Sequence, residues 1–210
     1  METDLDPRDR LLQAHTPAIA VPRFSELAPL ERNGHRYLVA EDGVYIELRR
    51  PWMSVIWPVA PSEAALPFGT VRNMGAHLEF EWKELTELLD PFERDANTAM
   101  PNEFAAWITW SSTGDGGHTL NYRPLLACAP SPSSLHLIRP ALAEGEHLVA
   151  DLHSHGAMEA FFSATDDEDD AGEVKYAAVL GGIGTDAPRW RVRLCLPGGQ
   201  FVDEDEWTER

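Results

Sequence analysis

The first clear alternation of apolar and polar residues lies in the N-terminal third of the chain. Residues 36–40 and 44–49 are short runs rich in β-branched and aromatic side chains, separated by Glu41-Asp42-Gly43. An Asp-Gly pair between two apolar runs is typical of a β-hairpin turn. A third run, residues 53–59, is bounded by prolines and predicts another strand. These segments indicate a small β-rich module.

The limits of this module follow from the flanking composition. Residues 60–71 contain the prolines and small residues of a connection, so we place a domain boundary near residue 75. We expect residues 1–20 to form a mobile arm. Large aromatic side chains dominate small cores, so we expect four of them in the core rather than in a ligand cage: Tyr37, Tyr45, Trp52 and Trp57.

The second part, residues 76–210, mixes helical and strand periods. Four apolar residues recur at helical spacing and predict one helix that ends near Pro91: Trp82, Leu85, Leu88 and Leu89. Residues 93–100 are polar and predict a loop. Strand patterns, the first of which also fits a helix end, follow at residues 104–112, 118–130, 135–140, 147–153, 176–180, 189–196 and 200–202. Many strands with one or two helices favour the α+β (mixed α/β) class.

Composition narrows the choice of partners. The 210 residues carry a formal net charge of -18, which argues against a nucleic-acid-binding protein and is compatible with a basic partner. The chain has no apolar stretch of transmembrane length, and its first residues are acidic and polar rather than signal-like. We therefore expect a cytoplasmic protein without membrane contacts.

The two cysteines, Cys128 and Cys195, each lie in an apolar run. Buried, reduced thiols are the preferred interpretation, with a disulfide or a metal-binding role as the alternatives.

The segment 151–166 carries the candidate chemistry. His153 and His155 end an apolar strand pattern, and alternation along a strand places both on one face, opposite Leu152 and Ser154. Ser163 and Asp166 form an S-x-x-D pattern, typical of a helix start, that can return Asp166 to the strand end. Two imidazoles and one carboxylate are typical protein ligands of a catalytic zinc ion.

Each element of this pattern has a simpler interpretation when taken alone. An H-x-H pair is common on exposed strands, and S-x-x-D is usually only a helix cap. The acidic residues after Asp166 are expected on a solvated surface: Asp167, Asp169 and Asp170. Asp151 is expected to be an ordinary polar strand residue rather than a support for the histidines. The remaining candidates are expected to be surface or core histidines: His118, His136 and His147.

Together these residues resemble a known family. His153-Ser-His155, Ser163 and Asp166 reproduce the H-S-H-x(7)-S-x-x-D signature of the JAMM (MPN-plus) zinc metalloproteases, which include deubiquitinases. The segment Pro101-Asn-Glu103 resembles the setting of that family's catalytic glutamate. Gly156 departs from the pattern, since many members have proline there.

Within this family, the chain most resembles PRTRC system protein A. That group belongs to a bacterial, often plasmid-borne cassette that also encodes a ParB-like and a ThiF-like (E1-like) protein. The resemblance covers roughly residues 76–205 and leaves the first 75 residues without an assigned role.

The resemblance implies an MPN-type β-sheet flanked by helices, with Zn²⁺ held by His153, His155 and Asp166. Glu103 would act as general base, and Ser163 would stabilise the oxyanion. The implied activity is hydrolysis of a peptide or isopeptide bond at the C-terminal tail of a ubiquitin-like protein, with an E1-like protein as a further partner. Alternatives are a non-catalytic MPN scaffold and the processing of a sulfur-carrier protein tail. The short loop 112–117 and the segment after Asp166 are expected to flank the site.

Overall fold

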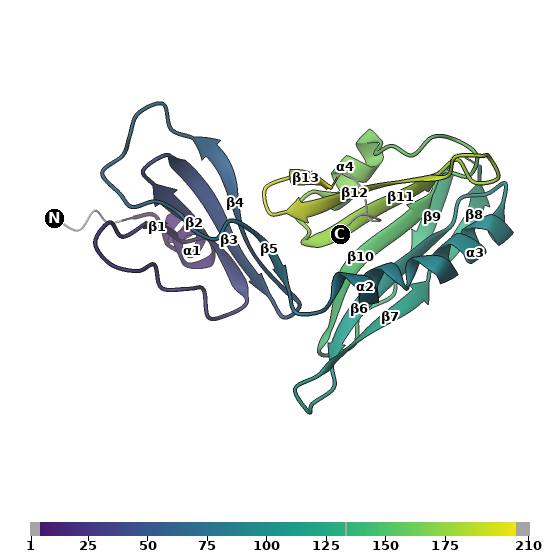
Figure 1. Cartoon of the computed structure of the whole chain (residues 1–210), viewed down its shortest axis with the longest axis horizontal. Coiled ribbons are helices and arrows are strands. Elements are labelled where there is room, and N and C mark those ends of the chain that lie inside the picture. Colours follow the sequence, from purple (N-terminus) through teal and green to yellow (C-terminus); the bar gives the residue numbers. More distant parts are fainter. Residues whose placement is uncertain (1–4, 133, 205–210) are drawn as a thin grey trace. The chain divides into compact units, whose positions relative to one another are not determined.

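The computed structural model describes residues 5–132 and 134–204, and the chain divides into two compact units, Met1–Glu79 and Phe80–Arg210 (Figure 1). We call them the N-terminal unit and the C-terminal unit.

The N-terminal unit contains a five-stranded sheet in the order β1-β2-β3-β4-β5. The strands are β1 (Ala18–Ala20), β2 (Gly34–Ala40), β3 (Gly43–Arg50), β4 (Met53–Pro61) and β5 (Gly75–Leu78). The hairpin predicted at Asp42-Gly43 is confirmed, since Ala40 pairs with Gly43. Trp52 and Tyr45 are buried, as expected for the core, whereas Tyr37 and Trp57 are only half-buried.

The expected mobile arm over residues 1–20 is wrong for its described part, residues 5–20. Helix α1 (Pro7–His15) begins where the Asp6 side chain accepts a hydrogen bond from the Arg8 backbone N–H. Strand β1 then pairs in parallel with β2. Within the described helix no side chain is buried, so the apolar pattern carried no signal for it. A capping residue and strand pairing order this segment instead.

The C-terminal unit is built on a six-stranded sheet in the order β13-β12-β11-β10-β6-β7 (Figure 1). Its strands are β6 (Ala105–Ser112), β7 (His118–Pro124), β10 (Glu146–Ser154), β11 (Lys175–Gly181), β12 (Arg189–Leu196) and β13 (Gln200–Glu204). Among the described strands of this sheet, β10 and β11 are the one parallel pair, and the crossover between them contains α4 (Ala164–Asp170). The α+β class is confirmed.

The one helix predicted before this sheet is two helices, α2 (Trp82–Thr86) and α3 (Leu89–Ala99). Pro91 lies in the first turn of α3, where a missing N–H leaves no helical hydrogen bond unmade. The loop predicted over residues 93–100 is therefore wrong. Phe92 and Ala96 are buried together with Leu89, and this apolar face holds the helix against the core.

A separate hairpin, β8 (Leu126–Ser131) with β9 (Ser134–Ile138), packs one face on the sheet. Leu135 and Leu137 contact the core there, whereas Cys128 is exposed. The expectation that both cysteines are buried is therefore wrong for Cys128 and right for Cys195, because Cys128 lies on the face of the hairpin that points away from the core.

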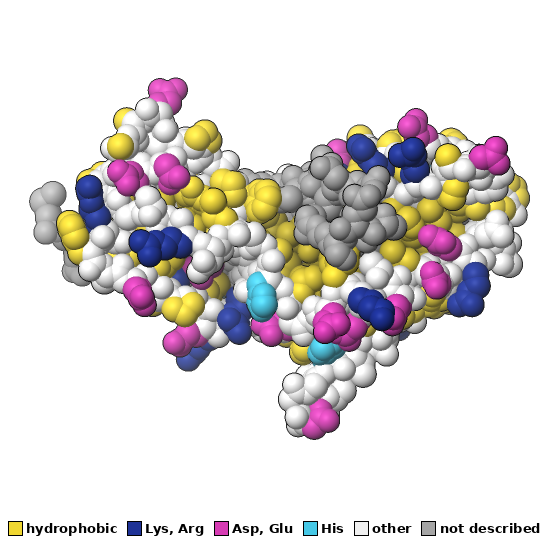
Figure 2. Space-filling model, in the orientation of Figure 1, with side chains coloured by type: hydrophobic (Ala, Val, Ile, Leu, Met, Phe, Trp, Pro, Cys, Tyr) yellow, Lys and Arg dark blue, Asp and Glu magenta, His cyan; other side chains and the backbone are white. Residues whose placement is uncertain are grey.

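Charged side chains of both signs are interspersed on the visible face of each unit, so the net negative charge is not gathered into one patch there (Figure 2). Within the described ranges, no helix is long and apolar enough to cross a membrane.

Candidate metal centre

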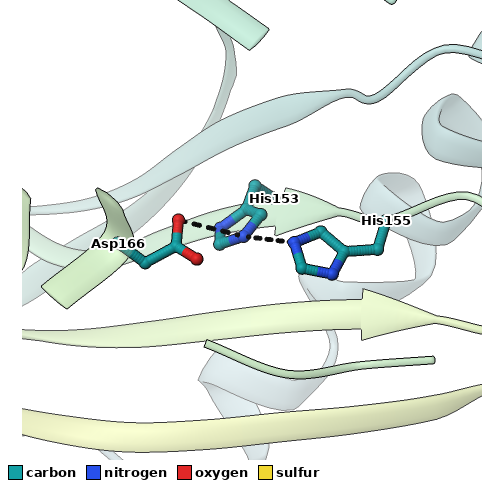
Figure 3. Close-up of side chains that lie close together, drawn as sticks. All are labelled: His153, His155 and Asp166. Carbon is teal, nitrogen blue, oxygen red and sulfur yellow. Dashed lines mark hydrogen bonds and ion pairs between the residues drawn. The ribbon is translucent and has the colours of Figure 1, made fainter. Parts of the chain in front are cut away.

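Two histidines and one aspartate converge at the end of strand β10 (Figure 3). The Nε2 atoms of His153 and His155 lie 3.2 Å apart, and Nε2 of His153 lies 3.5 Å from Oδ1 of Asp166. The possible ligand atoms of all three residues lie within 4.8 Å of one another. The structure therefore brings together the three residues that the sequence predicted as metal ligands.

Strand pairing with β11 orients the two histidines. His153 pairs with Val179, and the backbone N–H of His155 donates to the carbonyl of Leu180 at 2.8 Å. These bonds extend the regular strand past Ser154, so alternation places both imidazoles on one face. The local geometry is the one that the H-x-H spacing predicts.

The ring of His155 is held from two sides. Its Nδ1 lies 3.4 Å from the carbonyl oxygen of Glu159, which can accept a hydrogen bond from an Nδ1–H and leave Nε2 free as a ligand. The Phe161 ring meets it edge-on at a centroid distance of 4.6 Å. Burial lowers the pKa of His155, and the neighbouring His153 lowers it further. Both effects favour the neutral imidazole that binds metals.

Asp166 is oriented by the start of helix α4. Its Oδ2 accepts hydrogen bonds from the Ser163 N–H at 2.6 Å and the Ser163 hydroxyl at 2.7 Å, and Oδ1 remains towards His153. The predicted capping box is thus confirmed. Burial alone would raise the pKa of Asp166, but His153 and the bonds from Ser163 outweigh it and lower the pKa. The carboxylate is therefore held in its ionised form.

Glu103 is brought to the site by hydrogen bonds between its neighbour Phe104 and Ser154, which lie fifty residues apart in the sequence. The N–H of Phe104 donates to the Ser154 hydroxyl at 3.0 Å, and the Ser154 N–H donates to the Phe104 carbonyl at 2.9 Å. On its other side, the Glu103 N–H donates to the Ser131 carbonyl at 3.0 Å. Burial raises the pKa of Glu103, and Asp166 raises it further. This role of Ser154 was not predicted from the sequence, although a polar residue in an apolar strand is a usable signal.

A cavity of about 950 Å³ is lined by all five predicted site residues: Glu103, His153, His155, Ser163 and Asp166. Its size lies near the upper end of ligand-binding pockets. Met158 and Phe161 add apolar walls, and part of β9 adds another. The expectation that loop 112–117 flanks the site is wrong. His153 pairs with Ala105, so β6 runs away from the site and carries this loop to the opposite end of the sheet.

The acidic run after Asp166 is not uniformly solvated. Asp169 and Asp167 are exposed, but Asp170 is only 5% exposed. Its Oδ1 lies 2.9 Å from Nζ of Lys175, and its Oδ2 lies 2.7 Å from a guanidinium nitrogen of Arg193. The expectation of a solvated Asp170 is wrong, because strands β11 and β12 present two buried cations beneath α4.

Gly156 has a φ of +56°, in the left-handed region that proline cannot adopt. The loop after His155 therefore has a path that the proline found in many JAMM members could not follow.

Comparison with known proteins adds an independent observation. Residues 85–194 match the model of a family described as prokaryotic homologs of the JAB domain, and residues 6–79 match a domain of unknown function (DUF2016). No curated protein matches the chain.

Two solved structures are similar to part of the chain. One is the solution structure of a Desulfitobacterium hafniense protein, with 17% identity, a TM-score of 0.42, and coverage of 57% of this chain and 87% of that one. The other is the crystal structure of a JAB1/MPN domain protein from Archaeoglobus fulgidus, with 20% identity, a TM-score of 0.35, and coverage of 57% and 90%.

Proposed function

Because the chain belongs to the family of prokaryotic homologs of the JAB domain, we propose that its C-terminal unit is a zinc-dependent metallopeptidase that cleaves peptide or isopeptide bonds. One observation carries the proposal. The cavity that holds the cluster of His153, His155 and Asp166 is also lined by Glu103, a carboxyl group from a different segment.

The donor set fits zinc. Two imidazole nitrogens and one carboxylate oxygen are the protein ligands of many catalytic zinc sites, which keep one position for water or substrate. The Glu159 carbonyl beside His155 and the Ser163 groups on Asp166 leave Nε2 of His155 and Oδ1 of Asp166 for a metal. When bound, zinc would supply a Lewis acid that acidifies water and polarises the scissile carbonyl.

The protein groups around these ligands have distinct roles in the proposal. Glu103 takes a proton from water and returns it to the leaving amine, and its raised pKa suits both transfers. Ser163 lines the same cavity and offers a hydroxyl to the developing oxyanion, a contribution typically of about 2.7–4 kcal/mol.

As substrate we propose the C-terminal tail of a ubiquitin-like protein, with an E1-like protein of a PRTRC-type cassette as a further partner. The cavity beside the ligands supports this, since it is large enough for several residues of an extended chain and has apolar walls at Met158 and Phe161. Processing of a sulfur-carrier tail would use the same chemistry.

A non-catalytic scaffold is the second candidate, because the JAB family includes inactive members. The complete donor set and the adjacent Glu103 favour the enzyme over this candidate.

The test compares bound zinc and hydrolysis in the purified full-length chain. His153→Ala and Asp166→Ala should lose zinc, whereas Glu103→Gln should keep zinc and lose hydrolysis. The exposed residues His77 and Glu168 provide matched controls, as His77→Ala and Glu168→Gln. Normal zinc stoichiometry in His153→Ala would end the ligand assignment.

A second measurement separates the enzyme from the scaffold. Ubiquitin-like fusions with Gly-Gly tails are incubated with the zinc-loaded protein, with and without a chelator. Chelator-sensitive cleavage supports the enzyme, and its absence at full zinc occupancy supports the scaffold.

A further inference from the structure

Helix α4 supplies Asp166 but lacks the apolar face by which helices usually dock. Its sequence, ATDDEDD, has no apolar side chain larger than alanine, and its one buried residue is Asp170. A surface helix normally packs through an apolar stripe. Another interaction must therefore hold this helix on the sheet.

The sheet beneath α4 provides that interaction through two cations. Lys175 on β11 is fully buried, and Arg193 on β12 is 3% exposed. Nζ of Lys175 lies 3.0 Å from Asp151 and 2.7 Å from Glu173, in addition to its contact with Asp170. Arg193 also contacts Asp167 at 2.5 Å. We call these six residues the ion network, in which both cations, Asp170 and most of Asp151 are shielded from solvent while Asp167 and Glu173 reach the surface: Asp151, Asp167, Asp170, Glu173, Lys175 and Arg193.

The network joins the two elements that carry the predicted ligands. Asp151 lies on β10, two residues before His153 and on the same face of the strand. Asp170 lies on α4, about one turn after Asp166. Lys175 contacts Asp151 and Asp170 at once, so β10 and α4 share one buried cation.

Arg193 also holds the chain that enters α4. Its guanidinium lies 3.9 Å from the centroid of the Phe162 ring, and Phe162 immediately precedes the capping residue Ser163. A cation over an aromatic face stabilises both groups when they are shielded from water. The helix is thus fixed at its entry as well as along its inner face.

The position of α4 depends on the balance of charge between the two buried cations and the carboxylates around them. Burial alone would lower the pKa of Lys175, but Asp151 and Asp170 raise it above its usual range, so the ammonium group stays charged. If either Lys175 or Arg193 were removed, Asp170 would stay buried near other carboxylates with one cation instead of two. Breaking a buried ion pair from one side leaves an uncompensated buried charge, which destabilises the arrangement that holds it.

We propose that Lys175 and Arg193 are positioning residues of the metal centre, holding α4 so that Oδ1 of Asp166 faces His153. The inference rests on the proposed zinc site. In this inference, the position of the third ligand, Asp166, depends on Lys175 and Arg193, two side chains that would not touch the metal. Groups that orient metal ligands typically change metal affinity by about 10–100-fold when they are replaced.

The test uses Lys175→Met, Arg193→Lys and Asp167→Asn in the full-length chain, with Lys83→Met as the matched control. Lys83 is an exposed lysine on α2, and within the described part of the chain its ion pair is with Glu87. Two quantities are measured: zinc affinity by chelator competition, and amide exchange of residues 164–171 in the metal-free protein. We expect zinc affinity to fall at least about tenfold and α4 exchange to accelerate by a similar factor in Lys175→Met. Lys83→Met should match the wild type.

The milder variants keep the test decisive if Lys175→Met does not fold. Asp167 is exposed, so Asp167→Asn removes the negative charge opposite Arg193 without burying an unpaired group. Arg193→Lys keeps the charge but not the paired geometry, and we expect both to give intermediate effects.

The inference is overturned if the melting temperature falls while zinc affinity and α4 exchange stay within twofold of wild type, since the network would then only stabilise the sheet. If the wild type binds no zinc, the proposed function fails, and α4 exchange in the metal-free variants still decides whether the network positions the helix.

Discussion

Removing the Ser154 hydroxyl should loosen the segment that carries Glu103. Ser154 is fully buried between the two histidines, and its hydroxyl accepts the Phe104 N–H at 3.0 Å. In Ser154→Ala this amide loses its acceptor at a position that is fully buried. A buried, unsatisfied donor costs about 1–3 kcal/mol. The reverse bond, from the Ser154 N–H to the Phe104 carbonyl, remains and keeps the loss near the middle of that range.

A loss of about 2 kcal/mol is a large part of a typical unfolding free energy and should lower the midpoint of thermal unfolding by roughly 4–10 °C. Because the chain has two compact units, the assay follows amide exchange of residues 103–106 alongside urea unfolding. We expect faster exchange at Phe104, retained zinc and reduced hydrolysis.

The control for this prediction is Ser112→Ala. Ser112 is exposed at the far end of β6, and its hydroxyl accepts only a 3.4 Å bond from Gly114. It should stay within about 0.5 kcal/mol of wild type. If Ser154→Ala were as stable as Ser112→Ala and showed unchanged exchange at Phe104, the proposed coupling of Glu103 to β10 would be refuted.

Three further predictions concern the same unit. Gly181→Ala would bring a methyl group against the backbone of Ala160. This clash should displace loop 156–162, lower stability by about 1–3 kcal/mol and weaken zinc binding. Unchanged zinc affinity would contradict this prediction. Tyr122→Phe removes a 2.8 Å hydrogen bond to Asp95 and should lower the urea unfolding free energy by about 1 kcal/mol, whereas no change would show that water replaces it. The Ala143 N–H and the Thr109 hydroxyl lower the pKa of Glu146, so its contribution to stability is present above its unfolded pKa and disappears as pH falls through the folded one. The stability difference between wild type and Glu146→Gln should therefore shrink in acid, and a difference independent of pH would refute the assignment.

Local patterns predicted the parts of the fold that depend on neighbouring residues. The Asp42-Gly43 hairpin is present because the turn and the flanking alternation lie within a few residues. The same holds for the capping box from Ser163 to Asp166. The sequence pattern does not predict helix α3, because a proline commonly ends a helix, although a helix accepts proline in its first turn.

Exposure was harder to predict, because periodicity shows that side chains alternate and not what covers each face. In strand β12, alternation places Arg193 and Cys195 opposite the apolar residues Val192 and Leu194, so periodicity alone does not predict that all four are buried. Arg193 and Cys195 are buried there, and burial raises the pKa of the Cys195 thiol to about 12. Cys128 shows the opposite outcome, since its apolar run belongs to a hairpin with a free face.

The sequence by itself determined the candidate ligands and their local geometry. A period of two residues places His153 and His155 on one face, and a helix start returns Asp166 to them within fourteen residues. Only the tertiary structure decided how Glu103 approaches through Ser154, and which cations hold α4. These contacts join segments far apart in the chain. They form only when particular strands lie side by side, and the spacing of residues along the sequence does not determine which strands become neighbours.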